Sequence, residues 1–194
     1  AANSKPSISA VAGALIDVNT GQILYGKNMH IKRPPASTTK ILTTIIALEE
    51  ASLQEVVTVS RKAAYQEGSS IYLKVGEKVT MEELLYGIML ASGNDAAVAV
   101  AEHISGSVEE FARLMNKKAK EIGAKNSNFL NPNGLPQSGH LSTAYDLAMI
   151  MRYALRNKTF SKINATKYIN KSEWDRAFRN HNKLYVVWSK NNVQ

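Results

Sequence analysis

Residues 36–51 place the strongest constraint on what this chain can fold into. Two prolines, Pro34 and Pro35, disfavour helix immediately upstream, and the residues that follow are helical in character. The apolar side chains of this segment cover more than one face of the expected helix: Ile41, Leu42, Ile45, Ile46 and Leu48. A helix that is apolar around so much of its circumference is expected to be buried. Other parts of the chain must therefore surround it.

The remaining sequence predicts elements that could enclose this helix. Apolar runs on either side of turn residues predict a β-hairpin over residues 10–27. Capping patterns and apolar periodicity predict further helices over residues 80–91, 95–103, 107–123 and 143–155, capped by Thr80, Asp95, Ser107 and Thr143. Residues 183–189 resemble a late strand. We therefore expect one domain over residues 1–194, of the α+β class, with a helical cluster against an antiparallel sheet.

The composition narrows the classes of partner. Lys and Arg total 24 against 16 Asp and Glu, which gives a formal charge of +8 and favours anionic surroundings. Nucleic acid is not the expected partner, because the basic residues are scattered and no stretch interleaves them with stacking aromatic residues. Acidic lipid head groups or an anionic cell-wall polymer remain open.

Several kinds of site and segment are also unexpected. The chain has no cysteine, which excludes disulfides, thiolate metal sites and cysteine nucleophiles. Its four histidines show no metal-ligand spacing, so no metal site is expected. No apolar run is long enough to span a membrane, and the first ten residues are too polar for a signal peptide. If the protein is exported, we expect this sequence to be a mature form.

Ser37 and Lys40 are the first candidate site. A spacing of three at the start of a helix places both side chains on one face, beside the free N–H groups of the helix terminus. A serine hydroxyl needs a base to become a nucleophile, and a lysine serves as that base when its surroundings keep it neutral. The plain alternative is a capping serine followed by a solvated lysine.

Ser92 and Asn94 are the second candidate site. They flank a glycine at the break between two predicted helices, where a hydroxyl can relay a proton and an amide can hold a peptide. These residue types also dominate ordinary turns, which is the preferred interpretation when the pair is considered alone. The order Ser-x-x-Lys and then Ser-x-Asn about fifty residues later is that of the penicillin-recognising serine enzymes.

Longer stretches of the sequence resemble the low-molecular-mass penicillin-binding proteins that act as D-alanyl-D-alanine carboxypeptidases. The stretches that carry the resemblance run in order along the chain: residues 35–43 (PASTTKILT), 68–77 (GSSIYLKVGE), 84–97 (LLYGIMLASGNDAA), 131–136 (NPNGLP), 139–148 (GHLSTAYDLA) and 180–184 (NHNKL). The resemblance implies a β-lactamase-like, penicillin-binding transpeptidase-like fold. It also implies an exported enzyme without metal or cofactor, whose substrate is a peptidoglycan stem peptide ending in D-Ala-D-Ala, and which β-lactams inhibit covalently.

The resemblance also implies a role for each candidate residue. Ser37 is the nucleophile, Lys40 accepts its proton and Ser92 passes that proton to the leaving D-alanine. Asn94 holds the peptide of the substrate, and the Ser37 N–H donates to the oxyanion.

The sequence departs from the family pattern in one respect. It contains no Lys-Thr-Gly, Lys-Ser-Gly or His-Thr-Gly tripeptide, and the resemblance to the family ends after Leu184. In the family this strand binds the terminal carboxylate of the substrate and supplies the second oxyanion donor. We therefore expect a C-terminally truncated domain with impaired activity and an open sheet edge that invites self-association. The alternatives are a non-catalytic or strand-exchanging penicillin-binding fragment and, in third place, a β-lactamase.

Overall fold

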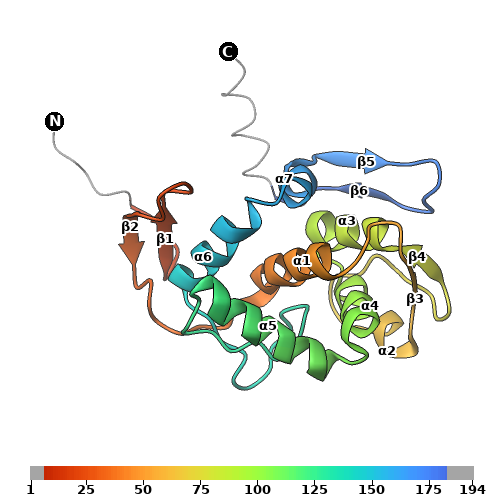
Figure 1. Cartoon of the computed structure of the whole chain (residues 1–194), viewed down its shortest axis with the longest axis horizontal. Helices are drawn as coiled ribbons and strands as arrows, with labels where there is room; N and C mark the ends of the chain where they lie inside the picture. The colour runs from red at the N-terminus through yellow and green to blue at the C-terminus, as the bar shows by residue number, and fades with distance from the viewer. Residues whose placement is uncertain (1–6, 183–194) are drawn as a thin grey trace, which may run out of the picture.

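A single buried helix organises the structure, a computed structural model that describes residues 7–182. Helix α1 (Thr39–Glu50) lies in the middle of the molecule and follows a short 3-10 turn, η1 (Ala36–Thr38). It contacts helices α3 (Met81–Ala91), α4 (Asn94–Ser105), α5 (Val108–Ile122), α6 (Ala144–Ala154) and α7 (Lys158–Ala165) (Figure 1). The expectation that residues 36–51 form a buried helix is therefore confirmed.

The core consists of two apolar clusters that share α1. Leu42, Ile45 and Ile46 are fully buried and pack with side chains of α5, α6 and α7, whereas Ala47 packs with α3 and α4. Complete burial of a Leu or Ile side chain stabilises the folded state by about 1.5–3 kcal/mol relative to an exposed one. This burial fixes α1 in place, and with it the residues at its N-terminus.

The strands of residues 7–182 form three separate two-stranded antiparallel sheets. Strands β1 (Gly13–Ile16) and β2 (Ile23–Lys27) confirm the hairpin predicted near the N-terminus. The other two pairs, which the sequence analysis did not predict, are listed here by their strands: β3 (Val56–Thr58) with β4 (Lys78–Thr80), and β5 (Tyr168–Asn170) with β6 (Ala177–Arg179). The α+β class is confirmed, with three small two-stranded sheets around the helices in place of one larger sheet (Figure 1). The strand expected over residues 183–189 lies outside the described residues.

Three of the predicted helix caps are present. Thr80, Ser107 and Thr143 each accept a hydrogen bond from the backbone N–H three residues later, and they precede α3, α5 and α6. The Asp95 cap was wrong: Gly93 occupies the N-cap position of α4 and Asp95 lies inside its first turn. Two short helices, α7 and α2 (Arg61–Ala64), were not predicted from the sequence.

Arg176 attaches the C-terminal hairpin to the helical body. Its guanidinium pairs with the carboxylates of Glu77 and Glu83 and donates to the carbonyl of Ile71 at 2.8 Å. Partly buried hydrogen-bonded ion pairs of this kind fix geometry as well as adding energy. The loop that carries Arg176 is therefore held against α3 and against residues 71–77. No helix in residues 7–182 has the length and apolar character needed to cross a membrane.

His140 joins the start of α1 to a distant loop. The side chain is 2% exposed, its Nδ1 accepts from the Leu130 N–H at 2.9 Å, and its Nε2 lies 3.0 Å from the Thr39 hydroxyl. Because Nδ1 is an acceptor, the ring is neutral and Nε2 carries the proton. Burial lowers the pKa of His140 below its usual 6.5.

This contact predicts a stability difference at acid pH. Because the pKa of His140 is lower in the folded chain, the unfolded chain takes up the proton first as the pH falls, so the free energy of unfolding decreases as the pH is lowered. His140→Gln keeps one acceptor and one donor but does not titrate. We therefore expect the free energy of unfolding of the variant to decrease less than that of the wild type between pH 7.5 and pH 5.5. Urea unfolding at both values measures the difference, and an identical change of stability in both proteins would contradict it.

Candidate active site

Ser37 lies at the exposed N-terminus of α1, in the 3-10 turn that precedes it. The preceding residue, Ala36, has φ 49°, which is the left-handed region that few residues other than glycine adopt. Such strain often marks functional sites. Within residues 7–182 the Ser37 N–H donates no hydrogen bond, so it is available to an oxyanion beside the serine.

A loop from the distant part of the chain packs directly on this turn. A Cβ atom at Gly134, where φ is 86°, would lie 1.9 Å from the Ala36 carbonyl oxygen and 3.1 Å from the Ser37 nitrogen. Only a residue without a side chain permits that approach. The loop at 131–135 therefore contacts the backbone on either side of the candidate nucleophile.

Lys40 lies one turn further along and is 3% exposed. Its Nζ donates to Asn94 Oδ1 at 2.7 Å and to the Asn133 carbonyl oxygen at 2.6 Å. Neither of these contacts involves Ser37, and the described residues contain no hydrogen bond between the Ser37 and Lys40 side chains. The alternative of a solvated lysine is therefore wrong, because the amine is enclosed and held by two acceptors.

Burial makes Lys40 a suitable base. Removal of the amine from water lowers its pKa from 10.5 to about 8, and the negative charge of Asp95 opposes the shift. With a pKa of about 8, roughly one amine in ten is neutral at pH 7. A lysine with the ordinary pKa of 10.5 would be neutral about 300-fold less often at the same pH.

Ser92 connects the second motif to the first. It ends α3 in a left-handed conformation with φ 58°, and its hydroxyl donates to the Ser37 hydroxyl at 3.1 Å. The left-handed conformation ends α3 before α4 begins and directs the Ser92 side chain toward the start of α1. The two serines, which are 55 positions apart in sequence, thus form a direct contact.

Asn94 is the first residue of α4 and is 5% exposed. Its Oδ1 accepts from Lys40, and its Nδ2 donates to the Glu67 carbonyl at 2.7 Å. Both ends of the amide are therefore engaged within the protein. Gly68 lies against the same amide, where a Cβ atom would be 2.8 Å from Nδ2. The substrate contact expected of Asn94 stays a prediction.

Asp95 has a different task from the helix cap assigned to it by the sequence. The carboxylate is fully buried and accepts hydrogen bonds from the Ser70 hydroxyl and from the backbone N–H groups of Ile71 and Leu73. These donors stabilise a buried charge that would otherwise be costly. They also fix the segment at 70–73 beside Asn94. The Ser70 side chain is thereby directed to Asp95.

A cavity of about 380 Å³ lies beside the candidate residues. Ser37, Lys40 and Ser92 line it together with apolar side chains from α1, α3 and α6, which are Ile41, Ile88, Met89 and Met151. Its remaining lining is polar and includes Asn164 and Asn180. The structure thus brings three of the four predicted site residues to one hollow, and the fourth, Asn94, contacts Lys40 behind it.

Two parts of the site were not identified from the sequence. The Asn133 carbonyl is a backbone group, and the sequence analysis assigned no role to residues 131–136 beyond their part in the family resemblance. Gln66 and the Glu67 carbonyl belong to a loop that showed no motif before residue 68. The arrangement as a whole combines an exposed hydroxyl, a buried amine that is neutral in part, and a free N–H, which are the parts of a serine acyl-transfer site.

The family comparison agrees with this geometry. A family model described as D-alanyl-D-alanine carboxypeptidase matches residues 1–194. Among curated relatives, the chain is 46% identical over 162 residues to the D-alanyl-D-alanine carboxypeptidase DacF of Bacillus subtilis. That match covers 81% of this chain and 42% of the relative, so the chain spans less than half of the length of that protein.

Solved structures show the same fold. Penicillin-binding protein 5 of Haemophilus influenzae is 34% identical with a TM-score of 0.86, and the match covers 96% of this chain and 56% of that one. An R248L mutant of the Streptomyces K15 DD-transpeptidase is 32% identical with a TM-score of 0.88, and the match covers 95% of this chain and 79% of that one. These similarities confirm the penicillin-binding fold, and the chain belongs to the D-alanyl-D-alanine carboxypeptidase family.

Proposed function

We propose that the residues of this chain form the acylation site of a serine-type D-Ala-D-Ala carboxypeptidase acting on peptidoglycan stem peptides. One observation carries the proposal. Ser37, Lys40 and Ser92 come from two helices and line one cavity, with the Lys40 amine buried and the Ser37 hydroxyl exposed. The family membership of the chain supports the substrate class.

The proposed reaction assigns one step to each of these groups. Ser37 Oγ attacks the carbonyl carbon between the two D-alanines, and its proton passes to the neutral amine of Lys40. The carbonyl oxygen becomes an oxyanion, to which the Ser37 N–H donates. The C–N bond then breaks, and the proton reaches the departing D-alanine nitrogen through the Ser92 hydroxyl, which already contacts Ser37. Water hydrolyses the resulting ester and regenerates Ser37.

An amine can replace water in the last step, which would make the same acyl-enzyme a transpeptidase. The similar Streptomyces K15 protein is a DD-transpeptidase, and this similarity supports transpeptidation as a second candidate activity. A β-lactam would acylate Ser37 by the same route, and rapid release of the opened drug would indicate a β-lactamase.

We further propose an extracytoplasmic location for the chain, where its net positive charge favours anionic wall polymers.

The first test is the covalent adduct. Incubation with a fluorescent penicillin is expected to add one drug molecule at Ser37, detected by mass spectrometry of peptides. Ser37→Ala should abolish the adduct, whereas Ser52→Ala, on an exposed loop, should not change it. An adduct on another residue would contradict the assignment.

The second test is the pH dependence of acylation. Lys40 acts as a base only when it is neutral, so the rate constant should rise with pH through a midpoint near 8. Between pH 7 and the plateau we expect an increase of about tenfold, which is the ratio of neutral amine. Stopped-flow or gel-based labelling from pH 6 to pH 10 measures the profile. A flat profile, or a midpoint near the ordinary lysine value of 10.5, would exclude Lys40 as the base.

A third test concerns self-association. The β1–β2 hairpin exposes apolar side chains, and Val11, Leu15 and Leu24 are 56%, 53% and 57% exposed. Exposed edges and apolar patches favour pairing with another chain. We propose that two copies associate through this hairpin, with a mass above that of a monomer in light scattering. Leu24→Lys should restore the monomer. A wild-type chain that stays monomeric at high micromolar concentration would contradict the proposal.

A further inference from the structure

The Lys40 amine depends on a carbonyl from a distant loop. A neutral amine has two N–H groups, and here one donates to Asn94 Oδ1 and the other to the Asn133 carbonyl. Because both N–H groups are engaged, the lone pair points away from these two acceptors, where it can receive a proton. The position of the Asn133 carbonyl therefore determines how the base is oriented.

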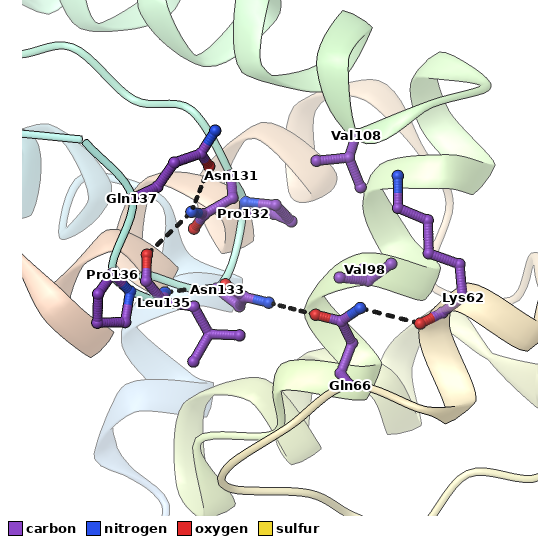
Figure 2. Close-up of a pocket in the computed structure, with 10 residues that line it drawn as sticks. All are labelled: Lys62, Gln66, Val98, Val108, Asn131, Pro132, Asn133, Leu135, Pro136 and Gln137. Atoms are coloured by element: carbon purple, nitrogen blue, oxygen red, sulfur yellow. Dashed lines mark hydrogen bonds between the residues drawn. The ribbon is translucent and has the colours of Figure 1, made fainter. Parts of the chain in front are cut away.

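The side chain of Asn133 fixes that carbonyl. Its Nδ2 donates to Gln66 Oε1 at 3.0 Å, and its Oδ1 accepts from the Leu135 N–H at 3.0 Å. Gln66 in turn donates through Nε2 to the Lys62 carbonyl of α2 at 2.9 Å. Figure 2 shows this chain of hydrogen bonds from the loop through Gln66 to α2. Asn133 is 3% exposed, so water does not offer these groups an alternative.

The pocket beside these hydrogen bonds is not itself a candidate ligand site. Its volume is about 250 Å³, and its polar side chains bond mainly to one another. Asn131 donates to the Leu135 carbonyl and to Gln137, and Asn131 Oδ1 accepts from the Gly134 N–H. Hydrogen bonds that close on themselves in this way stiffen the loop.

We propose that Gln66 and Asn133 form a clamp that positions the Lys40 amine, so that both are positioning residues for acylation at Ser37. The inference rests on the proposed function for its catalytic meaning. Its physical content is independent of catalysis: the clamp holds the loop at 131–135 closed over the amine. The same loop touches the Ser37 backbone through Gly134, so one clamp serves both the base and the nucleophile.

Two variants remove the clamp in different ways. Gln66→Met keeps the size of a half-buried side chain and removes the acceptor for Asn133. Asn133→Ala keeps the backbone carbonyl that Lys40 contacts and removes the tether that places it. Gln54→Met is the matched control, because Gln54 is exposed and contacts only the Ser52 hydroxyl among the described residues. Thermal unfolding of all variants verifies that each is folded.

The first readout is the titration of Lys40, followed by NMR of lysine labelled with ¹³C at Cε. Opening of the loop admits water to the amine, and because burial is what lowers the pKa of Lys40, hydration raises it. We expect both clamp variants to raise the Lys40 midpoint by about one unit, and Gln54→Met to leave it unchanged. The double variant should show no further rise, since both changes break one clamp. A purely structural role would lower the unfolding temperature without moving this midpoint, and that result overturns the inference.

The second readout is acylation by penicillin at pH 7. We expect the acylation rate constant of each clamp variant to fall about tenfold, in proportion to the neutral amine, with non-covalent affinity unchanged. Normal acylation in a variant whose Lys40 midpoint has shifted would also overturn the positioning role. If the wild type forms no adduct at Ser37, the proposed function fails, while the titration still decides whether the clamp exists.

Discussion

The amine of Lys40 is the group on which the rest of the site depends. A lysine that is 3% exposed is tolerated only because two acceptors meet it, and those acceptors come from the start of α4 and from the loop at 131–135. Burial favours the neutral amine and Asp95 favours the charged one, with burial the larger effect. The balance leaves a base that works near neutral pH. A site with only one of the two acceptors would leave the amine free to rotate.

Two strained backbone positions lie at the contact between Ser37 and Ser92. Ala36 and Ser92, on either side of the contact between the two serines, both adopt left-handed backbone conformations although neither is glycine. Each such residue costs of order 1 kcal/mol or more, which the surrounding packing must offset. The buried face of α1 provides that packing through Leu42, Ile45 and Ile46. The apolar helix and the strained turn are thus parts of one arrangement.

Local patterns were sufficient to predict the elements that carry local signals. Thr80, Ser107 and Thr143 marked helix starts because a capping hydroxyl and the N–H it serves are three residues apart. The grouping of Ser37, Lys40 and Ser92 was reached through spacing and resemblance. Backbone acceptors such as the Asn133 carbonyl carry no side-chain signal and could not be found in this way. Asp95 was misassigned because its N–H partners, Ile71 and Leu73, are distant in sequence.

The two acceptors of Lys40 lie 54 and 93 positions from it in the chain, whereas Ser37 is one turn away. In a nascent or unfolded polypeptide the lysine is hydrated and protonated, and so it leaves the serine inert. Chemical competence therefore arrives late, when the most remote parts of the sequence have closed over the amine. A covalent inhibitor of Ser37 would accordingly count correctly assembled molecules, and would ignore compact states in which α1 has formed but its neighbours have not.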